Sequence, residues 1–119
     1  MAAATETDFD DPLLAGLSIV VSQQDATTTI ALDGEWDLAQ QEKTREAVQS
    51  ALARQPDRVV LDLSRLTFMD LTGVHDVLEL ANQAARLKVD LVVVRGPRAV
   101  QRLFELCQLS EFLTCVDIA

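Results

Sequence analysis

The chain has 119 residues, of which 49% are hydrophobic, and its net charge is -9. This length and composition suit one domain built around a single core. Nucleic acid and anionic lipid bind cationic side chains, so the negative charge disfavours both as partners. The expected partner is therefore a protein or a small molecule.

The first 15 residues are rich in Ala, Thr and acidic residues and show no periodic apolar pattern. This predicts a disordered acidic tail over residues 1–15, followed by one domain over residues 16–119. The tail lacks the positive charge and apolar run of a secretory signal, and no stretch has the roughly 20 apolar residues that span a bilayer. We expect a cytoplasmic protein with no membrane insertion.

The domain is expected to begin with a hairpin and a helix. Two β-branched runs at 17–21 and 27–32, separated by polar residues, predict an antiparallel hairpin. Helical spacing of apolar residues follows from 38 to about 54. Asp37 is the expected N-cap of this helix, and Pro56 ends it.

The rest of the chain alternates strands and helices. Short apolar runs at 59–63 and 91–94 are typical of strands buried on both faces of a parallel sheet. A second helix is predicted from 71 to 87, a third after Pro97, and a last strand over 113–118. The expected inner faces are Val74, Val77, Leu78, Ala81 and Ala85 on the second helix and Val100, Leu103, Phe104 and Leu106 on the third. The predicted fold is α/β, a mixed β-sheet with helices packed against it, in the order β-β-α-β-α-β-α-β.

The turn after the strand at 59–63 is the candidate functional centre, because ligands and partners bind beyond the carboxyl ends of parallel strands. It reads Phe68-Met69-Asp70-Leu71-Thr72-Gly73. Asp70 or Thr72 can accept hydrogen bonds from the free amides of the helix start, and Gly73 leaves those amides uncovered. Local pattern alone allows two interpretations: an ordinary capped helix, or a helix start that exposes the Thr72 hydroxyl for modification.

Three segments of the chain resemble the STAS domain of bacterial anti-sigma factor antagonists, in that family's order and spacing. They are residues 32–38, 60–74 and 97–106. The resemblance covers nearly everything after residue 16. It implies a STAS-type mixed sheet with an N-terminal β-hairpin.

The resemblance also implies a switch at the turn. In that family, the residue before the glycine of an aspartate-x-serine-glycine turn is phosphorylated by a partner kinase that is itself the anti-sigma factor. Thr72 stands at that position, Gly73 matches the glycine and Asp70 the aspartate. Asp37 matches the aspartate that closes a Gly-Glu-x-Asp segment near the same turn. The implied partner is an anti-sigma factor, a serine-threonine kinase of histidine-kinase-like fold, which the unphosphorylated protein binds.

We therefore expect Thr72 to be the phosphorylation site of a non-enzymatic regulator of sigma-factor-dependent transcription. The expected partner-binding residues are Asp37, Asp70, Leu71, Thr72, Gly73, His75 and Asp76. No catalytic residue is expected, because His75 and Thr72 lack an oriented third group. No cofactor or metal is expected either, because the sequence has no glycine-rich phosphate loop and no CxxC pair.

The chain departs from the family's pattern at four places. Leu71 replaces a residue that is usually serine and adds apolar bulk beside the acceptor. Thr72 also replaces serine, so the kinase must accept an additional methyl group. Near residue 107 the family has a helix-ending glycine, whereas this chain has Cys107-Gln108, so the left-handed cap is lost or falls on a costlier residue. Trp36 replaces a smaller aliphatic residue and is expected to fill the core or a groove.

Three other interpretations compete with this one. A STAS subunit of an ABC lipid-transport complex would dock the same helix end on an ATPase without phosphorylation. A phospho-acceptor receiver domain is suggested by Asp62 at a strand end, but the acidic pair and the lysine that such a site needs are missing. A reversible disulfide between Cys107 and Cys115 would make a redox sensor, whereas a reducing cytoplasm favours two buried thiols.

Overall fold

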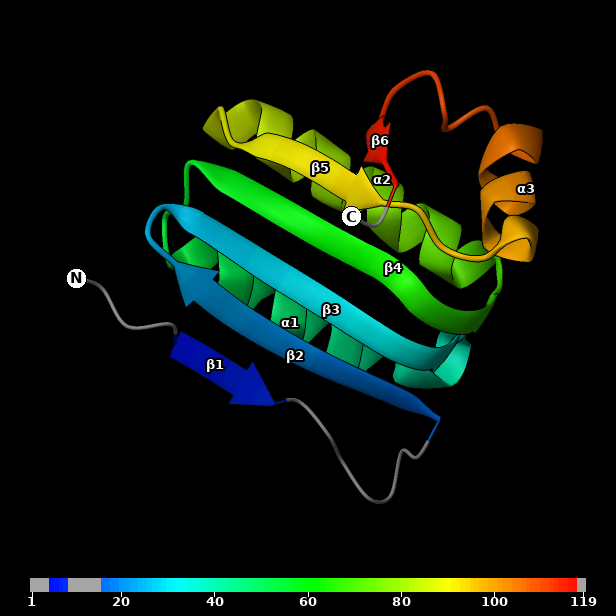
Figure 1. The fold of residues 1–119 in the computed structure, drawn as a ribbon, viewed down its shortest axis with the longest axis horizontal. Helices are drawn as coiled ribbons and strands as arrows, with labels where there is room; N and C mark the ends of the chain where they lie inside the picture. The colour runs from blue at the N-terminus through cyan, green and yellow to red at the C-terminus, as the bar shows by residue number, and fades with distance from the viewer. Residues whose placement is uncertain (1–4, 9–15, 118–119) are drawn as a thin grey trace.

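The computed structural model describes residues 5–8 and 16–117. Six strands form one sheet in the order β1-β2-β3-β4-β5-β6 (Figure 1). The elements are β1 (Thr5–Asp8), β2 (Leu17–Gln24), β3 (Thr27–Trp36), the 3-10 helix η2 (Leu38–Gln40), α1 (Gln41–Ala53), β4 (Arg58–Met69), α2 (Leu71–Leu87), β5 (Asp90–Val94), α3 (Arg98–Leu106) and β6 (Thr114–Val116). The predicted α/β order is confirmed, with one additional strand at the N-terminal side.

The sheet is mixed, as predicted. Strands β1, β2 and β3 pair antiparallel, and β3, β4, β5 and β6 pair parallel. Figure 1 shows α1 and α2 on one face of the sheet and α3 at one end of it. From Val59 to Ser64 of β4, buried residues accordingly alternate with half-buried ones. The expectation that the parallel strands are covered on both faces is therefore wrong for the second face.

The expected N-terminal tail contains a strand. Thr5–Asp8 pair with β2 from Val20 to Gln23. The prediction of a disordered tail is wrong for these four residues, where threonine alternates with acid along the open edge of β2. Residues 1–4 and 9–15 of the expected tail lie outside the described residues.

The hydrophobic core lies between the sheet and the helices. Its largest fully buried side chains include Trp36, Phe104, Ile30, Leu61 and Leu80. None of the helices in the described part of the chain is long and apolar enough to cross a membrane.

Two of the predicted inner helix faces needed correction. On α2, Leu78 and Ala85 are both exposed, because the buried stripe runs through Gly73, Val74, Val77, Leu80 and Ala84. On α3, Leu106 is 71% exposed.

The chain turns back into the core immediately after α3. Gln108 adopts a left-handed conformation with φ of 59°, and the amide of Leu109 then donates to the Phe104 carbonyl over 2.9 Å. Leu109 is buried and occupies the core where Leu106 was expected. The cap that glycine would supply is thus taken by glutamine, a costlier residue.

The cysteines are less buried than expected. Cys107 is exposed and Cys115 is half-buried, and both are free thiols. Burial raises the pKa of the Cys115 thiol, partly opposed by the charge of Arg95. The expectation of two buried thiols is wrong for Cys107, because α3 ends at Leu106 and leaves the next residue at the surface.

The two longest strands, β3 and β4, position the candidate turn at residues 68–73, which we call the functional turn. β3 and β4 pair as far as Trp36 and Met69, whereas β5 pairs with β4 only from Arg58 to Asp62. The ends of β3 and β4 therefore extend together beyond β5. The segments that follow these two strands lie next to each other at that end of the sheet.

Candidate functional site

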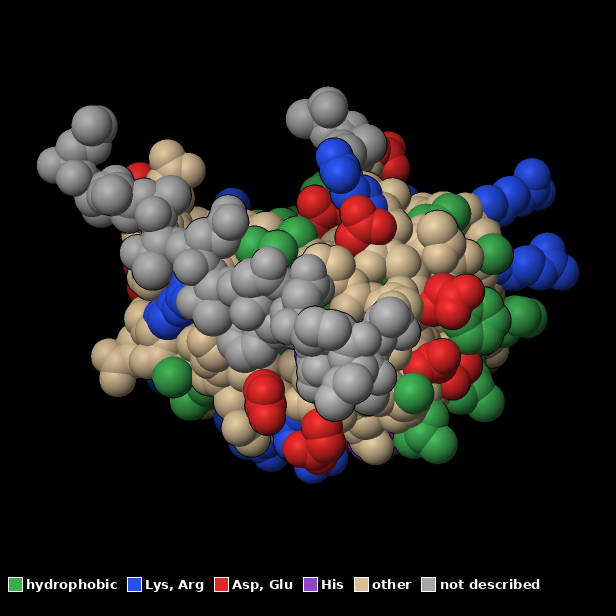
Figure 2. Space-filling model, turned by 90° about the horizontal axis from the view of Figure 1, so that it is seen from below, with side chains coloured by type: hydrophobic (Ala, Val, Ile, Leu, Met, Phe, Trp, Pro, Cys, Tyr) green, Lys and Arg blue, Asp and Glu red, His purple; other side chains and the backbone are tan. Residues whose placement is uncertain are grey.

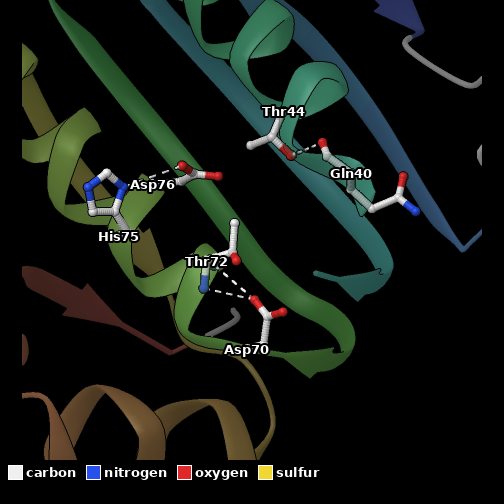
Figure 3. A network of polar contacts seen from close by, with 7 residues as sticks. Gln40, Thr44, Asp70, Thr72, His75 and Asp76 are labelled. Atoms are coloured by element: carbon white, nitrogen blue, oxygen red, sulfur yellow. Dashed lines mark hydrogen bonds and ion pairs between the residues drawn. The ribbon is translucent and has the colours of Figure 1, made fainter. Parts of the chain in front are cut away.

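Asp70 caps α2. Its Oδ1 accepts hydrogen bonds from the backbone amides of Thr72 at 2.8 Å and Gly73 at 3.4 Å (Figure 3). The Asp70 amide donates to the Trp36 carbonyl over 3.2 Å, which ties the turn to the end of β3. Of the two caps allowed by the sequence, Asp70 is the one that forms.

Thr72 keeps its hydroxyl uncommitted. Only the backbone amide of Thr72 takes part in the cap, and within the described residues its hydroxyl makes no hydrogen bond. The side chain is half-buried, and the neighbouring Leu71 is 66% exposed. The turn is therefore a capped helix start that also presents a hydroxyl, so the two interpretations of the local sequence are compatible.

Gly73 is required by packing. A Cβ at Gly73 would lie 2.5 Å from Met69 Cγ and 3.2 Å from Trp36 Cδ2. The first turn of α2 thus packs directly on the last paired residues of β3 and β4. This close approach sets the distance between the sheet and the start of α2, where Thr72 lies. The sequence did not predict it.

Asp37 lies on the adjacent strand end. Its Oδ1 accepts a hydrogen bond from the amide of Ala39 at 3.0 Å and caps η2, which confirms its predicted role as a helix cap. Because Trp36 pairs with Met69, Asp37 and Asp70 each follow directly after a paired position. Two carboxylates therefore lie at neighbouring strand ends around Thr72.

His75 and Asp76 lie one turn further along α2. His75 Nδ1 is 3.9 Å from Asp76 Oδ1, and the side chains are 67% and 17% exposed (Figure 3). Both border a groove of about 330 Å³ between α1 and α2, which Arg45 and Thr44 line from the opposite side. Their positions three and four residues after Thr72 place them on its side of the helix.

Burial raises the pKa of the Asp76 carboxyl above its ordinary value of 3.8. The charge of His75 is the largest opposing effect, followed by the Trp36 indole and by Arg45. Trp36 Nε1 and Asp76 Oδ2 are both buried and neither has a hydrogen-bond partner among the described residues. The Trp36 indole thus lowers the pKa of the Asp76 carboxyl without a well-formed hydrogen bond.

We expect Asp76→Asn to raise the free energy of unfolding at pH 7. A raised folded-state pKa means that the fold holds the proton more tightly than the unfolded chain, so the parent protein gains stability as the pH falls through that pKa. The advantage of the variant should therefore disappear below about pH 3.8. Urea titrations at several pH values measure it, and a variant less stable than the parent at pH 7 would contradict the assignment.

Two exposed apolar residues lie beside Leu71 at this end of the sheet, and one of them, Leu38, was not among the residues expected from the sequence. Leu38 at the start of η2 is 65% exposed, and Phe68 near the end of β4 is 48% exposed. Together with Leu71 they form what we call the apolar rim. An apolar residue directly after a helix cap, as at Leu71, is the signal that could have identified Leu38.

The comparisons with known proteins agree with this fold. Residues 19–114 match the family model described as Mlab, STAS domain. The anti-sigma-F factor antagonist RsfA of Mycobacterium tuberculosis is 28% identical over 107 residues, which cover 88% of this chain and 84% of RsfA.

Two solved structures share the fold. An anti-sigma factor antagonist from Mycobacterium paratuberculosis gives a TM-score of 0.77 at 20% identity, covering 83% of this chain and 84% of that one. The Bacillus cell fate determinant SpoIIAA in its phosphorylated form gives 0.68 at 20% identity, covering 85% and 91%. The match of the family model over most of its length shows that this chain belongs to the STAS domain family.

Proposed function

We propose that the protein is an anti-sigma factor antagonist that binds an anti-sigma factor through the turn at Asp70 to Gly73 and is released when Thr72 is phosphorylated. The observation that carries this proposal is the uncommitted Thr72 hydroxyl at a capped helix start. The name of the relative RsfA and the phosphorylated form of the structural neighbour SpoIIAA support it. The expected partner is a serine-threonine kinase of histidine-kinase-like fold, and the expected setting is the cytoplasm.

The electrostatics of the turn support a switch by charge. A phosphoryl group adds about -1.5 to -2 charges at neutral pH. The amides of Thr72 and Gly73 already donate to Asp70, so a phosphate can use them only by displacing that carboxylate. Asp37 and Asp76 add further negative charge nearby. The residues of the turn itself therefore compensate the new charge poorly, and the charge acts on whatever covers the turn.

Thr72→Glu is expected to lower the affinity for the anti-sigma factor by about 100-fold, because an uncompensated charge buried in an interface costs several kcal/mol and each 1.4 kcal/mol is tenfold. Titration calorimetry with the purified anti-sigma factor measures this change. Thr114→Glu is the matched control, because Thr114 is an exposed threonine in the strand β6 and is not part of the turn. It should bind like the parent.

The acceptor itself is identified by mass spectrometry after incubation with the kinase and ATP. The parent protein should carry one phosphate on Thr72, and Thr72→Ala should carry none. Labelling of Thr72→Ala to the level of the parent would exclude Thr72 as acceptor. Unchanged binding by Thr72→Glu would exclude the proposed switch.

A second candidate function is favoured by the apolar rim. Leu71 is 66% exposed beside the acceptor, and an exposed apolar residue suits a surface that stays docked. A STAS subunit of an ABC lipid-transport complex would use the turn in this way without phosphorylation. Pull-down from the source organism separates the two: recovery of an ABC ATPase in place of an anti-sigma factor would favour this second function.

A further inference from the structure

α3 carries two arginines that the rest of the described chain leaves unpaired. Arg98 and Arg102 are four residues apart and exposed, so they lie on one face of the helix. Neither forms an ion pair within the described residues. By contrast, the guanidinium groups of Arg45, Arg58, Arg65 and Arg95 each lie within 4.0 Å of a carboxylate.

These arginines lie at the same end of the molecule as the functional turn. Gly96, two residues before α3, approaches β4 so closely that a Cβ there would be 2.8 Å from the Leu63 carbonyl oxygen. Figure 1 shows α3 at the end where β4 turns into α2. In Figure 2, Lys and Arg side chains project at the right-hand end, near exposed hydrophobic side chains that have Asp and Glu side chains among them.

Taking the proposed function as its basis, we propose that the docking surface extends from the apolar rim to Arg98 and Arg102, and that the partner is a protein presenting an acidic surface opposite α3. An interface with an apolar centre and a charged periphery is the usual arrangement in proteins. Covering two arginines with a neutral surface would instead bury unpaired charges at a cost of several kcal/mol.

The charge of the whole protein strengthens the argument. With a net charge of -9, the molecule repels an acidic partner over most of its surface. Arg98 and Arg102 then form a local attraction beside the turn and orient the approaching partner. Charge at the periphery of an interface acts mainly on the association rate and on its salt dependence.

Charge reversal tests this proposal. Arg98→Glu/Arg102→Glu is expected to lower the association rate constant for the purified partner on the order of 30-fold at low salt, measured by surface plasmon resonance. The difference from the parent should shrink in 0.5 M NaCl, where screening is strong. Arg86→Glu, in the last turn of α2 and about 20 Å along the helix from Thr72, is the matched control and should bind like the parent.

Each outcome bears on one of the proposals. If the double variant binds the partner with the parent's rate and salt dependence, the extension to α3 is overturned and the proposed function is untouched. If pull-down recovers an ABC ATPase, the proposed function fails, and the same rate measurement with that ATPase decides the role of the arginines. A parent protein that binds neither overturns both.

A lipid target gives a different result. Vesicles of phosphatidylcholine with 30 mol% phosphatidylserine are the probe. Binding of the parent to these vesicles, abolished by Arg98→Glu/Arg102→Glu, would assign the arginines to anionic headgroups and overturn the proposal.

Discussion

Gly34→Ala is expected to lower the free energy of unfolding by about 3–5 kcal/mol. Gly34 lies in β3 with φ of +115°, a conformation that side chains rarely adopt, and a Cβ there would lie 2.1 Å from the Gly16 carbonyl oxygen. The oxygen belongs to the backbone and the position of a Cβ is fixed by the backbone, so no rotamer change relieves the clash. The same Gly16 carbonyl accepts a hydrogen bond from the Glu35 amide at 2.6 Å, which the substitution would break.

Thermal unfolding followed by circular dichroism measures the effect, and a Tm lower by more than about 10 °C is expected. Glu35→Ala is the matched control at the next, exposed position of the same strand. It should change stability by no more than about 0.5 kcal/mol. A Gly34→Ala variant as stable as the parent would show that β2 and β3 can separate at this point without cost.

Trp36→Ala is expected to lower the free energy of unfolding by about 3–5 kcal/mol as well. Trp36 is 2% exposed, and its ring contacts the position where α2 starts, so its removal leaves a cavity beneath Gly73. The first turn of α2 loses its support on the β3 side. Partner binding should therefore weaken along with stability.

Two further variants test whether the loss of stability comes from the burial of Trp36 or only from its position near the turn. Trp36→Phe keeps most of the ring volume and should cost about 1–2 kcal/mol. Phe68→Ala removes an aromatic side chain that is 48% exposed, and it should lower stability less than Trp36→Ala. Urea unfolding monitored by circular dichroism compares them. Equal losses for Trp36→Ala and Phe68→Ala would contradict the assignment of Trp36 to the core.

The sequence predicted the helix starts well because their signals are local. Asp37 was the expected cap of the first helix and caps η2, directly before α1. Asp70 was one of two possible caps of the second helix, whose predicted span 71–87 is the span of α2. Strand lengths were underestimated. After Leu63, polar residues interrupt the apolar run of β4, so the pattern did not predict that the strand continues. The strand continues because β3 pairs with it as far as Trp36 and Met69.

Exposure was harder to predict than secondary structure. Leu106 and Leu109 are equally hydrophobic, and only the left-handed turn at Gln108 determines which of them is buried. The exposure of two residues of the apolar rim was not predicted for a related reason. Whether Leu38 and Phe68 are covered depends on which segments fold over them, and that is a property of the tertiary structure.

The support of the functional turn comes from backbone pairing and from residues beneath it. The Asp70 amide is held by the Trp36 carbonyl, and Gly73 packs on Met69, whereas the side chains of Leu71 and Thr72 contribute no hydrogen bond among the described residues. These two positions are therefore free to diverge during evolution without altering the scaffold. One or two substitutions at the tip of a preserved turn are therefore enough to exchange the proposed acceptor, or to remove it and keep only a docking contact.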